Sequence, residues 1–207
     1  MGKLVAIDGA TFSGKTTTVK KLYEKLSKTH NVAIVPEMIR VVCKEHGIDK
    51  IEDLRKNKKL FVKVQKEVID RQIKIESELI DEHEIVITDR SVYSNLMYAS
   101  YGMYFEGINE ICEVFKPNRY NYIFLLEPIP EYIAKTVKPK FRSVQGIKNA
   151  AFQHLLLKNI LPHYIEIPFD DVDKRVEAIK NAISCPLGKP SCGEHCLWYY
   201  KGKCNYR

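Results

Sequence analysis

Short apolar runs alternate with longer amphipathic stretches along most of the chain. The amphipathic stretches repeat their apolar positions every three or four residues, as helices do, whereas the short runs are typical of buried strands. The predicted strands are residues 3–8, 31–37, 84–89, 120–127 and 163–168. Because strands that alternate with helices form a parallel sheet covered on both faces, the pattern predicts a three-layer α/β fold with about five strands.

Three of the predicted helices have clear apolar sides. Residues 14–28 carry Val19, Leu22 and Leu26 at helical spacing, and residues 171–183 form the last helix. The longest helix is predicted over residues 57–83. Its apolar residues along one side are Leu60, Val64, Val68, Ile75 and Leu79.

Residues 9–17 read GATFSGKTT and have the spacing G-x-x-x-x-G-K-T between the first predicted strand and a predicted helix. Glycines at these positions allow backbone angles that a Cβ would obstruct, so that successive N–H groups point into one concave anion site. Lys15 can reach the β- and γ-phosphates, and the Thr16 hydroxyl can ligate Mg²⁺. The sequence therefore predicts an ATP–Mg²⁺ site of the P-loop type. Its predicted phosphate-binding residues are Gly9, Ala10, Thr11, Phe12, Ser13, Gly14, Lys15, Thr16 and Thr17.

Acidic residues stand at the ends of four predicted strands: Asp8, Glu37, Asp89 and Glu127. In parallel sheets, ligands bind beyond the carboxyl ends of the strands. Asp89 ends an apolar strand, as a Walker B acid does, and would hold Mg²⁺ directly or through water. Glu37 is then the candidate general base on an acceptor hydroxyl, although the two acids could exchange these roles. Arg90, next to Asp89, is a candidate cation for the charge that develops on a transferred phosphoryl group.

Composition places the chain among ordinary globular proteins. The 207 residues, 45% hydrophobic and 29% charged, suit one domain with a small appendage. A membrane span needs about 20 apolar residues, and no such window is present. Because the N-terminus runs directly into the first strand, we expect no signal peptide and a cytoplasmic protein. The net charge of +7 fits a protein that handles phosphates, but a lysine-rich surface gives the same value.

The acidic residues after the second and third strands resemble those of small P-loop kinases. Glu37 follows strand two, and Asp89-Arg90-Ser91 follows strand three, in an arrangement similar to that of deoxynucleoside and thymidylate kinases. The resemblance implies that Glu37 acts on the acceptor hydroxyl and that Asp89 and Arg90 face the phosphates. A broader group of P-loop ATPases shares this organisation without sharing one substrate.

Residues 139–183 resemble the end of the ribosylnicotinamide kinase domain of bifunctional NAD-biosynthesis proteins. Arg142, Ser143 and Gly146 match a short lid motif, Phe152 matches the following helix, and Tyr164–Ile167 match a strand. With the P-loop, the resemblance covers roughly residues 3–183. It implies transfer of the γ-phosphoryl of ATP to a small nucleoside- or nucleotide-like acceptor, nicotinamide riboside among the candidates. The resemblance does not include the adenylyltransferase half of the bifunctional proteins, so we expect no NAD-synthesising activity.

The segment KTVKPKFRS at residues 135–143 concentrates positive charge before the next helix. As a lid it would close over ATP, with Arg142 neutralising charge on the migrating phosphoryl group. A solvated basic loop is the alternative interpretation.

Two groups of residues are candidates for the acceptor site. On the longest helix these are Gln65, Arg71 and Gln72, although polar helical residues more often face solvent. The second group could stack on a base, but core or surface packing is expected for most of its members. It comprises Tyr93, Tyr98, Tyr101 and Tyr104.

Four of the six cysteines fall in the last part of the chain, as C-x6-C-x3-C-x7-C: Cys185, Cys192, Cys196 and Cys204. In a cytoplasmic chain such a cluster favours metal over disulfides, and four thiolates suit tetrahedral Zn²⁺. An iron–sulfur cluster, disulfides or free thiols are the alternatives. Cys43 and Cys112 lie in helical patterns and are expected to be buried.

The chain therefore divides into a predicted nucleotide-binding domain, residues 1–183, and a Cys-rich tail, residues 184–207. The tail mixes aromatic and basic residues, as single-strand binders do: Trp198, Tyr199, Tyr200, Lys201, Lys203 and Arg207. These aromatics could instead pack against the domain. The main functional hypothesis is an ATP-dependent kinase. The alternative is an ATPase or nucleotide-dependent switch whose tail binds nucleic acid or a protein.

Overall fold

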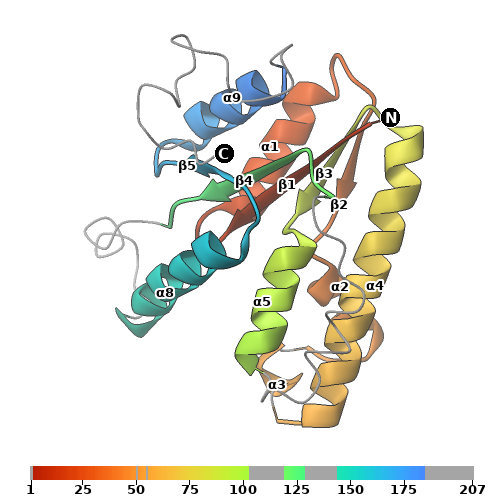
Figure 1. The fold of residues 1–207 in the computed structure, drawn as a ribbon, viewed down its shortest axis with the longest axis vertical. Coiled ribbons are helices and arrows are strands. Elements are labelled where there is room, and N and C mark those ends of the chain that lie inside the picture. The colour runs from red at the N-terminus through yellow and green to blue at the C-terminus, as the bar shows by residue number, and fades with distance from the viewer. Residues whose placement is uncertain (1, 50, 55, 103–118, 129–143, 185–207) are drawn as a thin grey trace.

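Five parallel strands form a single sheet at the centre of the protein (Figure 1). The computed structural model describes residues 2–49, 51–54, 56–102, 119–128 and 144–184. The strand order is β2-β3-β1-β4-β5. The strands are β1 (Lys3–Gly9), β2 (Val32–Val35), β3 (Ile85–Asp89), β4 (Tyr122–Leu126) and β5 (Ile165–Ile167). All five strands predicted from the apolar runs are confirmed.

Helices cover both faces of this sheet, so the predicted three-layer fold is confirmed. Figure 1 shows α1 and α9 on one face, with α4, α5 and α8 on the other. The described helices are α1 (Lys15–Leu26), α2 (Met38–Glu45), α3 (Ile51–Leu54), α4 (Lys58–Glu82), α5 (Val92–Gly102), α8 (Val144–Ile160) and α9 (Val172–Ile183). None of them is long and apolar enough to cross a membrane.

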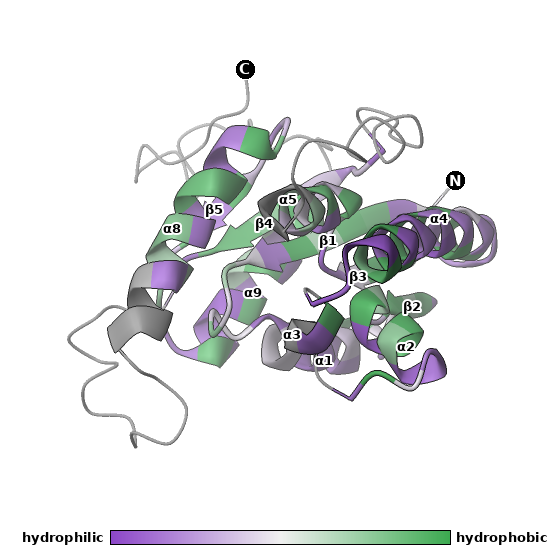
Figure 2. Ribbon diagram, turned by 90° about the horizontal axis from the view of Figure 1, so that it is seen from below, coloured by the Kyte–Doolittle hydropathy of each residue, from purple (hydrophilic) through white to green (hydrophobic). Residues whose placement is uncertain are grey.

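The central strand β1 is buried on both faces, which explains its continuous apolar run. Leu4 and Ala6 pack against one helical layer, while Val5 and Ile7 pack against the other. Figure 2 shows largely apolar strands running between helices in which polar and apolar segments alternate.

The first and last described helices pack against each other on one face of the sheet. The apolar side of α1 consists of Val19, Leu22 and Leu26, and it shares one buried cluster with Val176 and Ile179 of α9. Contacts between α1 and α9 therefore join the segment after the P-loop to the end of the described chain.

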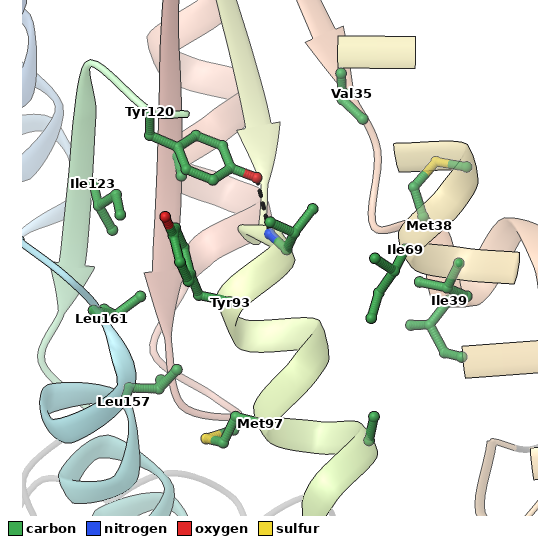
Figure 3. Packing of buried hydrophobic residues seen from close by; sticks show 14 of the residues in the cluster. Val35, Met38, Ile39, Ile69, Tyr93, Met97, Tyr120, Ile123, Leu157 and Leu161 are labelled. Carbon is green, nitrogen blue, oxygen red and sulfur yellow. Dashed lines mark hydrogen bonds between the residues drawn. The ribbon is translucent and has the colours of Figure 1, made fainter. Parts of the chain in front are cut away.

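On the opposite face, β4, α5 and α8 converge on a second buried cluster (Figure 3). Tyr120, two residues before β4, lies beside Tyr93 of α5, with their ring centroids 5.9 Å apart. The Tyr120 hydroxyl accepts a hydrogen bond of 2.8 Å from the Val92 backbone N–H. Because Val92 is the first residue of α5, this bond fixes the start of that helix.

Helix α4 departs from a simple apolar stripe. Val64 and Val68 are fully buried, whereas the other predicted apolar positions are half-buried at the edge of the cluster. Three polar residues are also buried on this helix: Gln65, Gln72 and Glu76. Their contacts belong to the site described next.

Candidate functional site

The P-loop connects β1 to α1 at the carboxyl end of the central strand. A Cβ on Gly9 would lie 2.4 Å from Ser13 Oγ, so only glycine allows the loop to close this tightly. Gly14 immediately precedes α1 with a left-handed φ of 86°, and Phe12 has a φ of 66°. The loop therefore has the backbone geometry that a concave phosphate-binding site requires.

Lys15 lies over this loop, and its ammonium group is almost entirely buried. Its Nζ donates a hydrogen bond of 2.8 Å to the Ala10 carbonyl. Burial lowers the pKa of Lys15 to about 8, and the positive charge of Arg90 adds to that effect. A phosphate bound on the loop would place negative charge beside the Lys15 ammonium group and so raise its pKa.

Thr16 and Asp89 form a hydroxyl–carboxylate pair at the start of α1. Thr16 Oγ1 donates to Asp89 Oδ2 over 2.7 Å, and Asp89 Oδ1 is buried without a hydrogen-bond partner among the described residues. Burial raises the pKa of Asp89, against the opposing effects of Thr16 and Lys15. Hard oxygen ligands of this kind suit Mg²⁺. The pair therefore fits a magnesium ion that accompanies a bound nucleotide.

Glu37 and Arg90 meet across the ends of β2 and β3. Arg90 Nη2 lies 2.7 Å from Glu37 Oε1, and Arg40 Nε lies 2.6 Å from Glu37 Oε2. Burial alone would raise the pKa of Glu37, but the charges of Arg90, Arg40 and Lys15 outweigh it and lower the pKa. Glu37 is therefore ionised at neutral pH. The guanidinium of Arg90 also lies 4.2 Å from the centre of the Tyr98 ring.

The backbone of Arg90 is held in a left-handed conformation, with a φ of 97°. Gln72 of α4 donates from Nε2 to the Arg90 carbonyl over 2.7 Å, and its Oε1 accepts from Asn95 Nδ2. Gln72 Nε2 also lies 2.7 Å from Glu76 Oε1, whose carboxylate accepts from the Tyr120 hydroxyl over 2.9 Å. This buried network offsets the cost of an unusual backbone angle at a site residue.

The other two strand-end acids have structural roles. Asp8 is fully buried and accepts hydrogen bonds from the Ser91 backbone and from the hydroxyls of Ser91 and Ser94. Glu127 Oε2 accepts from the Phe169 N–H over 3.0 Å. Both acids brace the loops after neighbouring strands.

Sequence reasoning missed Arg175, which supports the P-loop from α9. Its Nη1 donates to the Ser13 carbonyl over 2.8 Å, and its Nη2 donates to the Glu127 carbonyl over 3.3 Å. Arg175 is only 4% exposed. The available signal was its place beside the apolar stripe of Val172, Val176 and Ile179, where a charged residue is unexpected.

A cavity of about 560 Å³ joins the P-loop to Glu37 and continues between α4, α5 and α8. Its walls are Thr11, Phe12, Gly14, Lys15, Thr16, Thr17, Glu37, Ile39, Arg40, Phe61, Gln65, Arg90, Asn95, Tyr98, Asn149 and Gln153. One space thus contacts both the phosphate-binding residues and the candidate acceptor residues.

The structure separates the candidates for the acceptor site. Gln65 and Tyr98 line the cavity, whereas Tyr93 is buried in the core. Gln72 lies behind Arg90 and does not line the cavity. Arg71 points away and forms ion pairs with Glu45 and Glu67 on the surface. Of the candidates on α4, Gln72 and Arg71 therefore do not face the cavity, because the helix turns them toward the core and the solvent.

Several predicted residues lie outside the described part of the chain: Tyr104, Cys112, Arg142, Cys185, Cys192, Cys196 and Cys204. Cys43 is buried in α2, as predicted. Within the described ranges, no group of three or more His, Cys, Asp or Glu residues could hold a metal ion. Metal binding by the tail cysteines stays a prediction.

Comparison with models of protein families gives a match over most of the chain. The model of one family, described as AAA domain, matches residues 4–175. This match spans the P-loop, the strand-end acids and the whole sheet. A comparison with curated proteins found no significant match. The chain thus belongs to the AAA domain family and is a P-loop nucleotide-binding protein.

Proposed function

We propose that the protein is a kinase that transfers the γ-phosphoryl group of ATP to a hydroxyl of a small nucleoside- or nucleotide-like acceptor. One observation carries this proposal. The ionised Glu37, paired with Arg90 at 2.7 Å, faces the same cavity as Lys15 and Thr16. Besides the nucleotide, hydrolysis of ATP needs only a water molecule at the γ-phosphate, whereas the lining of this cavity extends beyond Glu37 to α4, α5 and α8.

Each group has a role that follows from its contacts. Catalysis of phosphoryl transfer consists mainly of positioning and charge stabilisation. Lys15 and the loop N–H groups bind the phosphates, while Thr16 and Asp89 hold Mg²⁺. Glu37 orients the acceptor hydroxyl. Its lowered pKa makes it a hydrogen-bond acceptor for that hydroxyl at neutral pH.

Among the described cations, we propose Arg90 as the one that stabilises the charge developing on the transferred phosphoryl group. Its side chain lines the same cavity as Lys15 and Glu37, so its positive charge would stabilise a phosphoryl group transferred there. Arg142, which lies outside the described residues, is proposed for the same task.

The side of the cavity formed by α4 and α5 suits a planar, polar ring. Phe61 and Tyr98 provide aromatic surface, and Gln65 and Asn95 provide amides that can both donate and accept hydrogen bonds. Nucleobases and the carboxamide ring of nicotinamide riboside have matching chemistry. Gln65 is only 4% exposed, and its amide makes no hydrogen bond within the described ranges.

The tail belongs to this proposal as a separate unit. We assign its four cysteines to a structural zinc site, with an iron–sulfur cluster as the alternative. In the rival function, an ATPase or switch, the tail would bind nucleic acid or a protein partner.

The proposal is tested by measuring ADP release over a panel of nucleosides, nucleotides and nicotinamide riboside, with mass spectrometry of the products. The Glu37→Gln variant should lower kcat by about 10²–10⁴-fold while leaving ATP affinity nearly unchanged. Glu24→Gln, a matched change at an exposed site on α1, should behave as wild type. ADP release without any phosphorylated product across the panel would instead establish an ATPase.

A further inference from the structure

Gln153 of α8 connects the P-loop to α5 through a single oxygen atom. Its Oε1 accepts hydrogen bonds from the Thr11 N–H and the Thr11 hydroxyl, each over 3.0 Å. The Tyr98 hydroxyl donates to the same atom over 3.1 Å. Three donors from two elements therefore converge on one amide.

These contacts fix the orientation of the amide group. A backbone N–H can only donate, so the Gln153 atom facing Thr11 must be the oxygen. The Nε2 group is consequently turned away from the loop backbone. It makes no hydrogen bond with any residue that the structure describes, and the side chain lines the cavity beside Thr11 and Tyr98.

The position of Gln153 is also tied to Arg90. Tyr98, whose hydroxyl donates to the Gln153 amide, has its ring centre 4.2 Å from the Arg90 guanidinium. Arg90 in turn pairs with Glu37. Gln153, Tyr98 and Arg90 all line the cavity that the P-loop shares with Glu37. Gln153 therefore brings a neutral donor to the space in which a phosphoryl group would move from the P-loop toward a hydroxyl at Glu37.

We infer that Gln153 is a further catalytic residue, whose Nε2 donates hydrogen bonds to oxygens of the γ-phosphoryl group of ATP. The inference rests on the proposed function, which places ATP on the P-loop and the acceptor at Glu37. A neutral amide suits this place, since it stabilises phosphoryl oxygens without forming an ion pair with Glu37. ADP lacks the group that Gln153 contacts, so the residue should favour ATP over ADP.

The test compares binding of the non-hydrolysable ATP analogue AMP-PNP with binding of ADP, both with Mg²⁺, by calorimetry. Gln153→Met keeps the length of the side chain but removes both the Nε2 donor and the Oε1 acceptor of the Thr11 and Tyr98 bonds. It should weaken AMP-PNP binding by about tenfold or more, with ADP binding within about twofold of wild type. The same variant should lower kcat with any acceptor that the panel identifies.

The Gln153→Glu variant distinguishes a residue that contacts phosphate from one that only holds Thr11 and Tyr98 together. The carboxylate still accepts from Thr11 and Tyr98, but it cannot donate and it repels phosphate. AMP-PNP binding should fall at least as far as in Gln153→Met. The control, Asn159→Ala, removes an exposed amide from the same helix and should leave both affinities unchanged.

If the Gln153→Glu protein prefers AMP-PNP over ADP as strongly as the wild type does, the inference is overturned. Gln153 would then only hold Thr11 and Tyr98 together. Equal losses for both nucleotides in the two variants would also overturn it, because they would indicate damage to the loop. These affinities are measured without an acceptor. Failure to find a phosphorylated product would therefore refute the kinase proposal and leave the nucleotide preference standing.

Discussion

Lys15 combines two demands that conflict in the absence of nucleotide. It must be buried to contact phosphates on the loop, yet burial disfavours its charged form and lowers its pKa to about 8. The free protein therefore holds this lysine protonated below that pH and increasingly neutral above it. Bound phosphate favours the ammonium form, so nucleotide binding must be coupled to proton uptake in alkaline solution.

The first prediction follows from this coupling. ADP affinity should fall as pH rises from about 7 to about 9.5, by roughly tenfold, because the neutral Lys15 must gain a proton on binding. Calorimetry in buffers of different ionisation enthalpy should detect that proton. Lys15→Arg stays charged throughout this range, so its affinity should depend less on pH. The same decline in both proteins would assign the effect to another group.

At the scale of single residues, the sequence predicted those site residues that belong to short local patterns. Lys15 and Thr16 belong to one short motif, and Glu37 and Asp89 end strands whose carboxyl ends meet at one edge of the sheet. Gln153 has no such pattern, since its partner Thr11 is 142 residues away in the chain. Its role depends on where α8 crosses the P-loop, and a contact of that range leaves no trace in nearby residues.

Among the elements, α4 carries more of the site's support than its apolar pattern suggested. Its buried side includes Gln72 and Glu76, which hold the turn after β3 in place. Arg90 lies in that turn with a φ of 97°. When only the apolar residues of a helix are used to predict its buried side, its polar residues are expected to face solvent. The burial of Gln72 and Glu76 could therefore not be predicted from the sequence.

The second prediction concerns Gln72→Leu. The substitution leaves the Arg90 carbonyl and the Asn95 amide buried without this partner, and should lower the free energy of unfolding by about 1–3 kcal/mol. Urea denaturation measures this loss. Turnover should fall as well, since the Arg90 backbone is no longer held. Gln65→Leu is the matched control on the same helix. Because the Gln65 amide makes no hydrogen bond within the described ranges, its replacement should change stability little.

A Gln72→Leu protein as stable as wild type would contradict the network. Normal stability combined with reduced turnover would instead place Gln72 in contact with a substrate.

At the scale of the whole molecule, the protein is proposed to consist of a nucleotide-binding domain and a cysteine-rich tail. The third prediction is that purified protein contains about one equivalent of zinc or has the visible absorbance of an iron–sulfur cluster. Cys192→Ser combined with Cys196→Ser should lose the metal, since neutral hydroxyls cannot replace thiolates. The double variant should keep nucleotide binding. Cys43→Ala, which changes a buried cysteine of α2, should keep the metal.

Elemental analysis that finds no metal in anaerobically prepared protein, with the tail thiols freely titratable, would disprove the metal site. If the tail is a recognition module, the double variant should lose salt-sensitive binding of single-stranded nucleic acid and retain catalysis.

The packing of α1 against α9 has a consequence for how the protein is made. Ser13 and Arg175 are separated by 162 residues, yet Arg175 braces the P-loop and α9 covers the apolar side of α1. A growing chain releases its N-terminal segments from the ribosome first. The nucleotide-binding loop is therefore synthesised early but lacks the support of Arg175 until α9, the last described helix, emerges. Until then Val19, Leu22 and Leu26 of α1 lack the contribution of Val176 and Ile179 to their buried cluster, so the part of the chain that binds ATP gains its full packing only near the end of synthesis.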